Sequence, residues 1–203
     1  MKTALIIVDI QNDFCEGGAL AVPHANEIVS VVNELSNSNK FDIVVTTQDY
    51  HPLKHGSFAS THNKEVFTLG ELSGKPQVMW PDHCVEGTKG AEFHPELDLS
   101  NVDKNFPKGQ SHNVDSYSGF YDNDKINSTG LSKYLKENDV ESVYVVGLAL
   151  DYCVKYTALD AVSEGFKTYL IHNATRAVNM NEGDDLRAIQ ELVMSGVWVG
   201  SIL

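Results

Sequence analysis

Short apolar runs alternate with amphipathic stretches of helical period along this chain of 203 residues. Residues 3–9, 41–47 and 142–147 are continuous runs rich in β-branched side chains. Such runs are typical of strands that are buried on both faces. The segment after Pro23 instead repeats apolar residues every three or four positions, as on one face of a helix. This alternation predicts right-handed crossovers and a parallel sheet covered by helices on both sides.

The remaining pattern extends this arrangement to the end of the chain. We expect further strands over residues 101–106, 166–171 and 197–199, and helices over 129–137, 151–164 and 184–194. Residues 50–106 are mostly irregular, and a loop this long in a compact domain is usually functional or partly structured. We therefore predict a single domain over residues 1–203, a three-layer α/β/α fold whose central parallel sheet has about six strands.

Charge and cysteine content narrow the class of partner. The chain has 28 acidic and 15 basic side chains, a net charge of −13. This balance disfavours nucleic acid and anionic membrane surfaces, which need clustered lysine and arginine. Three cysteines, Cys15, Cys84 and Cys153, cannot all pair, so we expect reduced thiols and a cytoplasmic protein. We expect no secretory signal and no membrane span, because no apolar run is long enough.

Reactive side chains follow several of the predicted strands. Asp9 ends the first strand, Asp49 and His51 end the second, Lys108 follows the third and Cys153 follows the fourth. Ligands of open parallel sheets bind at the carboxyl ends of the strands. The five side chains are therefore expected to meet at one edge of the sheet.

Cys153 is the best candidate for a nucleophile. If Asp151 caps the helix, Cys153 lies in its first turn, where free N–H groups and the helix dipole favour a thiolate. Lys108 could supply a stabilising cation, and Asp9 could accept the thiol proton. The alternative is a buried, inert helix cysteine, which is common in proteins.

Asp49 and His51 suggest a metal site. Two residues apart on an extended segment, they point the same way, and His83 from the long loop could be a third ligand. A carboxylate and two imidazoles with open positions suit zinc, iron or manganese. Further donors remain open, namely His55, His62, Ser57 or water.

Three aromatic residues lie near these groups in the sequence: Phe14, Trp80 and Tyr117. A flat apolar slot beside a nucleophile and a metal would suit an aromatic ring substrate. The alternative is that each ring only packs its own loop.

Six motifs in this order resemble the nicotinamidases of the isochorismatase-like cysteine hydrolase superfamily. They are residues 9–14 (DIQNDF), 48–52 (QDYHP), 55–59 (HGSFA), 80–88 (WPDHCVEGT), 115–120 (DSYSGF) and 147–154 (GLALDYCV). The resemblance runs nearly end to end. It implies hydrolysis of nicotinamide to nicotinate and ammonia in NAD salvage, with pyrazinamide as a second substrate.

The resemblance also implies roles for individual residues. It makes Asp9, Lys108 and Cys153 the catalytic triad, and the backbone N–H groups of Ala149 and Cys153 the oxyanion donors. It makes Asp49, His51 and His83 the ligands of one divalent ion, with zinc expected and iron or manganese as alternatives. It makes Phe14, Trp80 and Tyr117 the ring pocket, and it implies a cis peptide bond between Ala149 and Leu150.

Other functions remain as alternatives. An amidase of the same superfamily that acts on carbamoyl or ureido substrates would lack the metal motif, and isochorismate hydrolases typically lack the cysteine. A non-catalytic binding scaffold would not need the complete triad, and a structural zinc protein would unfold on chelation without amidase activity. Whether the chain forms a homo-oligomer is left open by the sequence.

Overall fold

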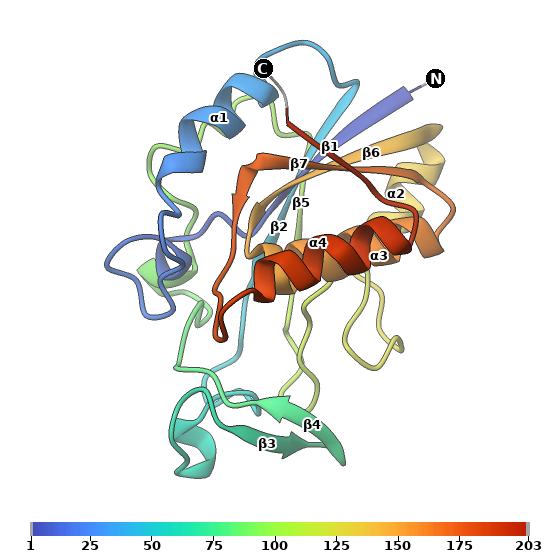
Figure 1. Ribbon diagram of the computed structural model, residues 1–203. Helices are drawn as coiled ribbons and strands as arrows, with labels where there is room; N and C mark the ends of the chain where they lie inside the picture. Colours follow the sequence, from blue (N-terminus) through green and yellow to red (C-terminus); the bar gives the residue numbers. More distant parts are fainter. Residues whose placement is uncertain (1, 202–203) are drawn as a thin grey trace.

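The computed structural model describes residues 2–201, and the core of this part is a parallel sheet of six strands (Figure 1). The strand order is β5-β2-β1-β6-β7-β8, with parallel pairing throughout. The strands are β1 (Lys2–Val8), β2 (Ile43–Asp49), β5 (Lys104–Lys108), β6 (Val140–Leu148), β7 (Lys167–Arg176) and β8 (Trp198–Gly200). The predicted parallel sheet is therefore confirmed.

Helices cover both faces of this sheet, as Figure 1 shows. They are α1 (Glu27–Ser36), α2 (Leu131–Glu137), α3 (Lys155–Ser163) and α4 (Asp184–Met194). Ala4, Ile6 and Val8 of β1 pack in a cluster with α2, α3 and α4, whereas Leu5 and Ile7 pack in a second cluster with α1. Because successive strand residues point to opposite faces, the continuous apolar run is buried on both sides. The three-layer prediction is confirmed. No helix within residues 2–201 is long and apolar enough to cross a bilayer.

Two strands extend further toward their carboxyl ends than expected. The second strand was predicted to stop at residue 47 and the third at residue 106, but β2 ends at Asp49 and β5 at Lys108. The parallel register pairs Asp49 with Lys108. These polar side chains continue the strands because backbone pairing, rather than apolar character, holds that end of the sheet.

The start of the nucleophile helix differs from the prediction. A π-helical turn over Leu150–Val154 precedes α3, and Ala149 is its N-cap residue. The predicted Asp151 cap is wrong: Asp151 instead accepts hydrogen bonds from the backbone N–H groups of Val178 at 2.9 Å and Asn179 at 2.8 Å. The cis peptide bond joins Leu148 and Ala149, one residue earlier than expected.

The long segment before β5 contains an antiparallel hairpin that the sequence did not predict. Its strands are β3 (Leu69–Leu72) and β4 (Lys75–Val78), and it lies apart from the main sheet (Figure 1). The strands have four residues each and are largely exposed, so they lack the apolar pattern that reveals a strand. Gln77 of β4 donates to Asp115 at 2.9 Å, which ties the hairpin to the loop after β5.

Candidate active site

Lys108 is the centre of a buried polar cluster at the carboxyl end of the sheet. Its Nζ lies 2.8 Å from Asp9 Oδ2, donates to Asp49 Oδ1 and to the Ser116 carbonyl at 2.8 Å, and lies 3.4 Å from Cys153 Sγ. Burial opposes the ammonium, but Asp49 and Asp9 outweigh it and raise the pKa of Lys108 well above its usual range. Lys108 is therefore a fixed positive charge beside the sulfur.

Asp9 follows β1 directly and is fully buried. Its Oδ1 accepts a hydrogen bond from Thr47 Oγ1 at 2.6 Å, and one of its carboxylate oxygens lies within 4.8 Å of Cys153 Sγ. Burial raises the pKa of Asp9, and the ammonium of Lys108 opposes that rise. A carboxylate whose affinity for protons is increased in this way is suited to accept one from a nearby thiol.

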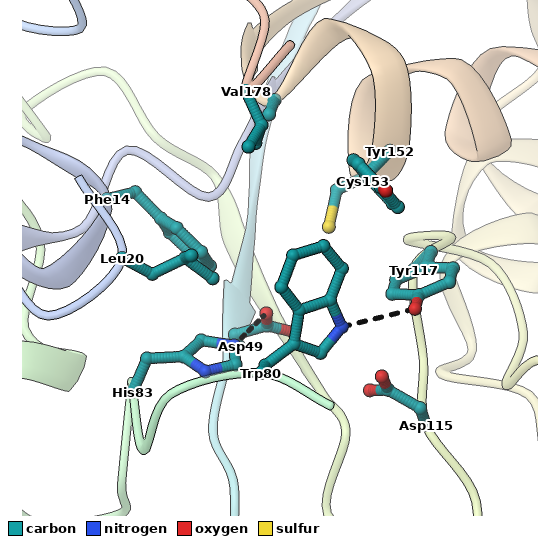
Figure 2. Close-up of a pocket in the computed structure, with 11 residues that line it drawn as sticks. Phe14, Leu20, Asp49, Trp80, His83, Asp115, Tyr117, Tyr152, Cys153 and Val178 are labelled. Atoms are coloured by element: carbon teal, nitrogen blue, oxygen red, sulfur yellow. Dashed lines mark hydrogen bonds and ion pairs between the residues drawn. The ribbon is translucent and has the colours of Figure 1, made fainter. Parts of the chain in front are cut away.

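Cys153 lies in the π-helical turn after β6 and points its sulfur into the cavity of Figure 2. Burial raises the pKa of its thiol well above the usual range, and Lys108 opposes that shift. The free side chain is therefore protonated at neutral pH. Making the thiolate requires a base in contact range, and Asp9 is placed to be that base.

Asp49, His51 and His83 bring three donor atoms together within 4.8 Å of one another. Asp49 Oδ2 lies 3.5 Å from His51 Nε2 and 3.9 Å from His83 Nε2. The Nδ1 atoms donate to backbone carbonyls, His51 to Gly109 at 2.9 Å and His83 to Pro81 at 2.7 Å. Because a carbonyl can only accept, these bonds fix the ring orientations and leave both Nε2 atoms toward Asp49.

The donor set fits a divalent metal ion. Within residues 2–201, His51 Nε2 is buried and has no hydrogen-bond partner, which is costly unless an ion binds it. Burial, together with the charge on His51, lowers the pKa of His83 to about 4, so this imidazole is neutral and able to ligate. Burial opposes protonation of His51, but Asp49 outweighs it and raises its pKa. Metal binding at His51 would therefore release a proton.

The other candidate donors are engaged elsewhere. His55 Nδ1 accepts from the backbone N–H of Ser57 at 3.2 Å and lies 2.7 Å from its hydroxyl, while His55 Nε2 donates to the Val114 carbonyl at 3.3 Å. His62 Nε2 donates to a backbone carbonyl at 2.8 Å. The structure does not bring His55 or His62 into the donor set, although the His55 ring packs 4.4 Å from that of His51.

A narrow cavity of about 30 Å³ opens beside these groups (Figure 2). Its walls include all three aromatic residues singled out in the sequence, Phe14, Trp80 and Tyr117, and Trp80 Nε1 donates to Tyr117 Oη at 3.2 Å. The remaining lining residues are Leu20, Asp49, His83, Asp115, Ala149, Tyr152, Cys153 and Val178. A cavity this narrow, with mostly apolar walls, favours a small molecule.

Sequence reasoning missed four residues of this wall: Leu20, Asp115, Tyr152 and Val178. Tyr152 precedes Cys153 directly, and Asp115 stands two residues before Tyr117, so proximity to a predicted site residue could have found both. Leu20 and Val178 carry no such signal. They reach the cavity only because of loop conformations.

Two polar residues from the first loop hold the donor set in place. Gln11 is fully buried, and its amide accepts from Asp49 N at 2.8 Å and donates to Asp49 O at 2.7 Å. Asp13 Oδ2 accepts from the backbone N–H of Cys84 at 2.7 Å, next to His83. Both residues belong to the motif of residues 9–14, and both fix backbone rather than contact the cavity.

Comparison with known proteins agrees with this geometry. The nicotinamidase of Escherichia coli (strain K12) is 45% identical over 195 residues, which cover 95% of this chain and 92% of that protein. The solved structure of the Acinetobacter baumanii nicotinamidase and pyrazinamidase has a TM-score of 0.94 and 44% identity, covering 98% of this chain and 96% of that one. The structure of a Pyrococcus horikoshii pyrazinamidase in complex with zinc has a TM-score of 0.81 and 35% identity, covering all of both chains.

The family itself is defined over nearly the whole sequence. The isochorismatase domain matches residues 3–202, a range that contains every residue of the Lys108 cluster, the metal donor set and the aromatic wall. The chain belongs to the isochorismatase family.

Proposed function

We propose that this protein is an amidohydrolase that converts nicotinamide to nicotinate and ammonia, as in NAD salvage. One observation carries the proposal: Cys153 Sγ, 3.4 Å from Lys108 Nζ, faces the same small aromatic cavity as the metal donors Asp49 and His83. A nucleophile, a cation site and a flat apolar wall are the three elements that a pyridine carboxamide needs. The nicotinamidase relatives support this substrate.

The first step makes the nucleophile. Asp9 accepts the proton of the Cys153 thiol, and the ammonium of Lys108 stabilises the thiolate that remains. Burial raises the pKa of the Asp9 carboxylic acid, which makes this carboxylate a better proton acceptor. Lys108 keeps its own proton, since Asp49 and Asp9 hold it in the charged form.

The thiolate then attacks the carboxamide carbon. Ala149 and Cys153 lie at the N-terminal end of the helical segment, where backbone N–H groups lack intrahelical partners, and these two groups hold the oxyanion. The C–N bond breaks as Asp9 returns its proton to the leaving nitrogen, which departs as ammonia. Losing one oxyanion donor typically costs about 3–4 kcal/mol.

Hydrolysis of the thioester completes the cycle. A water molecule enters the position that ammonia has left, and Asp9 takes one of its protons. The resulting hydroxide attacks the thioester carbon, the C–S bond breaks, and nicotinic acid forms, which gives its proton to solvent and leaves as nicotinate. Asp9 then returns the proton to the sulfur of Cys153, so the starting state is regained.

Asp49, His51 and His83 would hold one divalent ion, for which we propose zinc. A carboxylate and two imidazoles with open positions form a zinc site of the catalytic kind, with iron or manganese as the alternatives. When bound, such an ion supplies a Lewis-acid contact for a ring nitrogen. The zinc complex of the Pyrococcus horikoshii relative supports this assignment.

The aromatic side chains of the cavity wall are placed to contact the ring of the substrate. Phe14 and Trp80 lie on opposite sides of the cavity, so a flat heteroaromatic ring between them has apolar contacts on both faces, and Tyr117 lies beyond Trp80 (Figure 2). Pyrazinamide differs from nicotinamide by one ring nitrogen and is expected to be a second substrate.

A cytoplasmic location remains part of the proposal, and all three cysteines are free, as that compartment requires.

Ammonia release from nicotinamide tests the function directly. The purified protein should release ammonia, lose this activity on chelation and regain it with added zinc. A carbamoyl or ureido amide in the same assay separates the related amidases of the superfamily, which should act without metal. Release from those substrates but not from nicotinamide would reject the proposal.

A further inference from the structure

Asp115 is a buried carboxylate that faces the cavity and has no lysine or arginine partner within residues 2–201. Its side chain is 3% exposed and accepts two hydrogen bonds, from Ser116 N at 2.8 Å and from Gln77 Nε2 at 2.9 Å. Both hydrogen-bond donors to its side chain are neutral amide groups.

The position of Asp115 links it to the metal donors. It lines the same cavity as Asp49 and His83, and its carboxylate lies within 4.8 Å of ring nitrogens of His51 and His55. These three residues cannot form a second metal site. Both nitrogens of His55 are engaged, and His51 has only Nε2 unpartnered, which faces Asp49. Asp115 therefore belongs to the surroundings of one ion.

The formal charges around the metal donors indicate what Asp115 contributes to ion binding. Counted as the ion pairs that they form, the Asp9 and Asp49 carboxylates and the Lys108 ammonium carry one net negative charge. A divalent ion added to these groups alone would leave a buried site with an excess positive charge. The carboxylate of Asp115 brings the negative charge to two, which the ion neutralises.

We propose that Asp115 is a positioning residue of the metal site whose negative charge increases the affinity for a divalent ion without Asp115 being one of the three ligands. The inference rests on the proposed metal-assisted function and adds a residue to it. It also gives the hairpin a role, because Gln77 of β4 donates to Asp115 and to Tyr117 Oη. The hairpin thus holds the charge in place.

Zinc titration of the metal-free protein tests the inference. Asp115→Asn keeps the size of the side chain and an acceptor oxygen but removes the charge. We expect its zinc affinity, measured by competition with a chromophoric chelator, to fall by about 10–100-fold. Asp115→Glu, which restores the charge at a slightly different position, should recover part of the loss. An affinity of Asp115→Asn within twofold of the parent would overturn the inference.

Thermal unfolding separates a charge effect from simple damage to the fold. Asp115→Asn keeps an acceptor oxygen and removes a buried charge, so the Tm of the metal-free protein should stay near that of the parent, while the rise in Tm on adding zinc becomes smaller. A merely structural role predicts the opposite, a lower Tm for both forms with an unchanged zinc-dependent rise. That pattern would also overturn the inference.

Asp122→Asn is the matched control. Asp122 is a buried carboxylate, 6% exposed, that accepts from Ile126 N and Asn127 N and does not line the cavity. Its neutralisation should leave zinc affinity unchanged. If the parent protein itself failed to bind zinc, the proposed function would fall together with the inference. If the parent bound zinc and Asp115→Asn bound it equally well, the inference alone would fall.

Discussion

The two halves of the site are built in different ways. Asp9, Lys108 and Cys153 stand at or just beyond the ends of β1, β5 and β6, and the pairing of the sheet sets their spacing. His83, Trp80 and Tyr117 come from irregular segments. Side-chain hydrogen bonds hold those segments, such as that from Cys84 N to Asp13 and that from Trp80 to Tyr117.

This difference separates reactivity from recognition. Strand ends in a parallel sheet are fixed by many backbone hydrogen bonds, so the spacing of the Lys108 cluster is difficult to disturb. Loops on such a scaffold can be altered with little effect on it. Changes in the loop half should therefore affect metal and ring binding, and changes in the strand half should affect turnover.

The largest effect is expected from Cys153→Ala. Removing the sulfur takes away the nucleophile, so turnover of nicotinamide should fall by about 10⁴-fold or more. Zinc content and Tm should stay near those of the parent, because the loop half is untouched. Steady-state ammonia release and metal analysis of the same preparation check both statements, and substantial residual turnover would exclude Cys153 as the nucleophile.

His51→Ala is expected to disrupt metal binding. Loss of one of three donors should reduce zinc affinity by more than about 100-fold and raise KM for nicotinamide. Alkylation of Cys153 by iodoacetamide, followed by mass spectrometry, should proceed within about threefold of the parent rate if the halves are separate. Full metal occupancy in this variant would contradict the ligand assignment.

Asp13→Ala should weaken zinc binding less than His51→Ala, because it removes a support of the loop and not a metal donor. Asp13 accepts from Cys84 N at 2.7 Å and from Ala19 N at 3.2 Å, and bonds to a charged acceptor are worth about 1.5–3 kcal/mol each. Loosening the turn that carries His83 should weaken zinc binding by about tenfold while leaving Cys153 alkylation unchanged. Asp98→Ala, at a half-buried position where the side chain accepts from Ser100 N at 2.9 Å, is the control. Equal zinc affinity in the two variants would show that Asp13 does not support the metal site.

Glu164→Gln should have the smallest effect. We expect it to change the stability of the fold and to leave turnover unchanged. Glu164 accepts from Tyr121 Oη at 2.6 Å, from Lys136 Nζ at 2.6 Å and from Ser132 Oγ. Lys136 and Ser132 hold the ionised form and lower the pKa of Glu164 from 4.5 to about 2. A lowered carboxyl pKa stabilises the fold above the unfolded value, and this contribution is lost as the pH falls from about 4.5 toward about 2.

The measurement is urea unfolding of Glu164→Gln and the parent at pH 7 and pH 3. At pH 7 the variant should be less stable by about 1 kcal/mol, since water screens this partly exposed group. The difference should shrink at pH 3, and nicotinamide turnover at pH 7 should be unchanged. A gap that stays constant with pH would show that ionisation of Glu164 does not stabilise the fold.

The strand half could largely be predicted from the sequence. Residues 3–9 and 142–147 have apolar runs that only a doubly covered strand explains, and the polar residues that follow them meet at one edge. The parallel topology therefore predicts that Asp9, Lys108 and Cys153 lie together. The single domain over residues 1–203 stays a prediction.

The loop half was less predictable because its geometry depends on contacts between distant residues. Gln77 lies 38 residues from Asp115 in sequence, and their hydrogen bond gives no periodic signal. The predicted helix cap at Asp151 was wrong for the same reason. Its carboxylate oxygens accept from Val178 N and Asn179 N, which lie far along the chain. The short hairpin has neither an apolar face nor the length that reveals a strand.

Asp49 is the exception to the division into halves. One of its oxygens accepts from Lys108 and the other faces His51 and His83. Any substitution of this aspartate would perturb cation affinity and the electrostatic environment of the thiol at the same time. Double-mutant cycles that include Asp49 should therefore show coupling energies with members of either group, whereas cycles between His83 and Cys153 should be nearly additive.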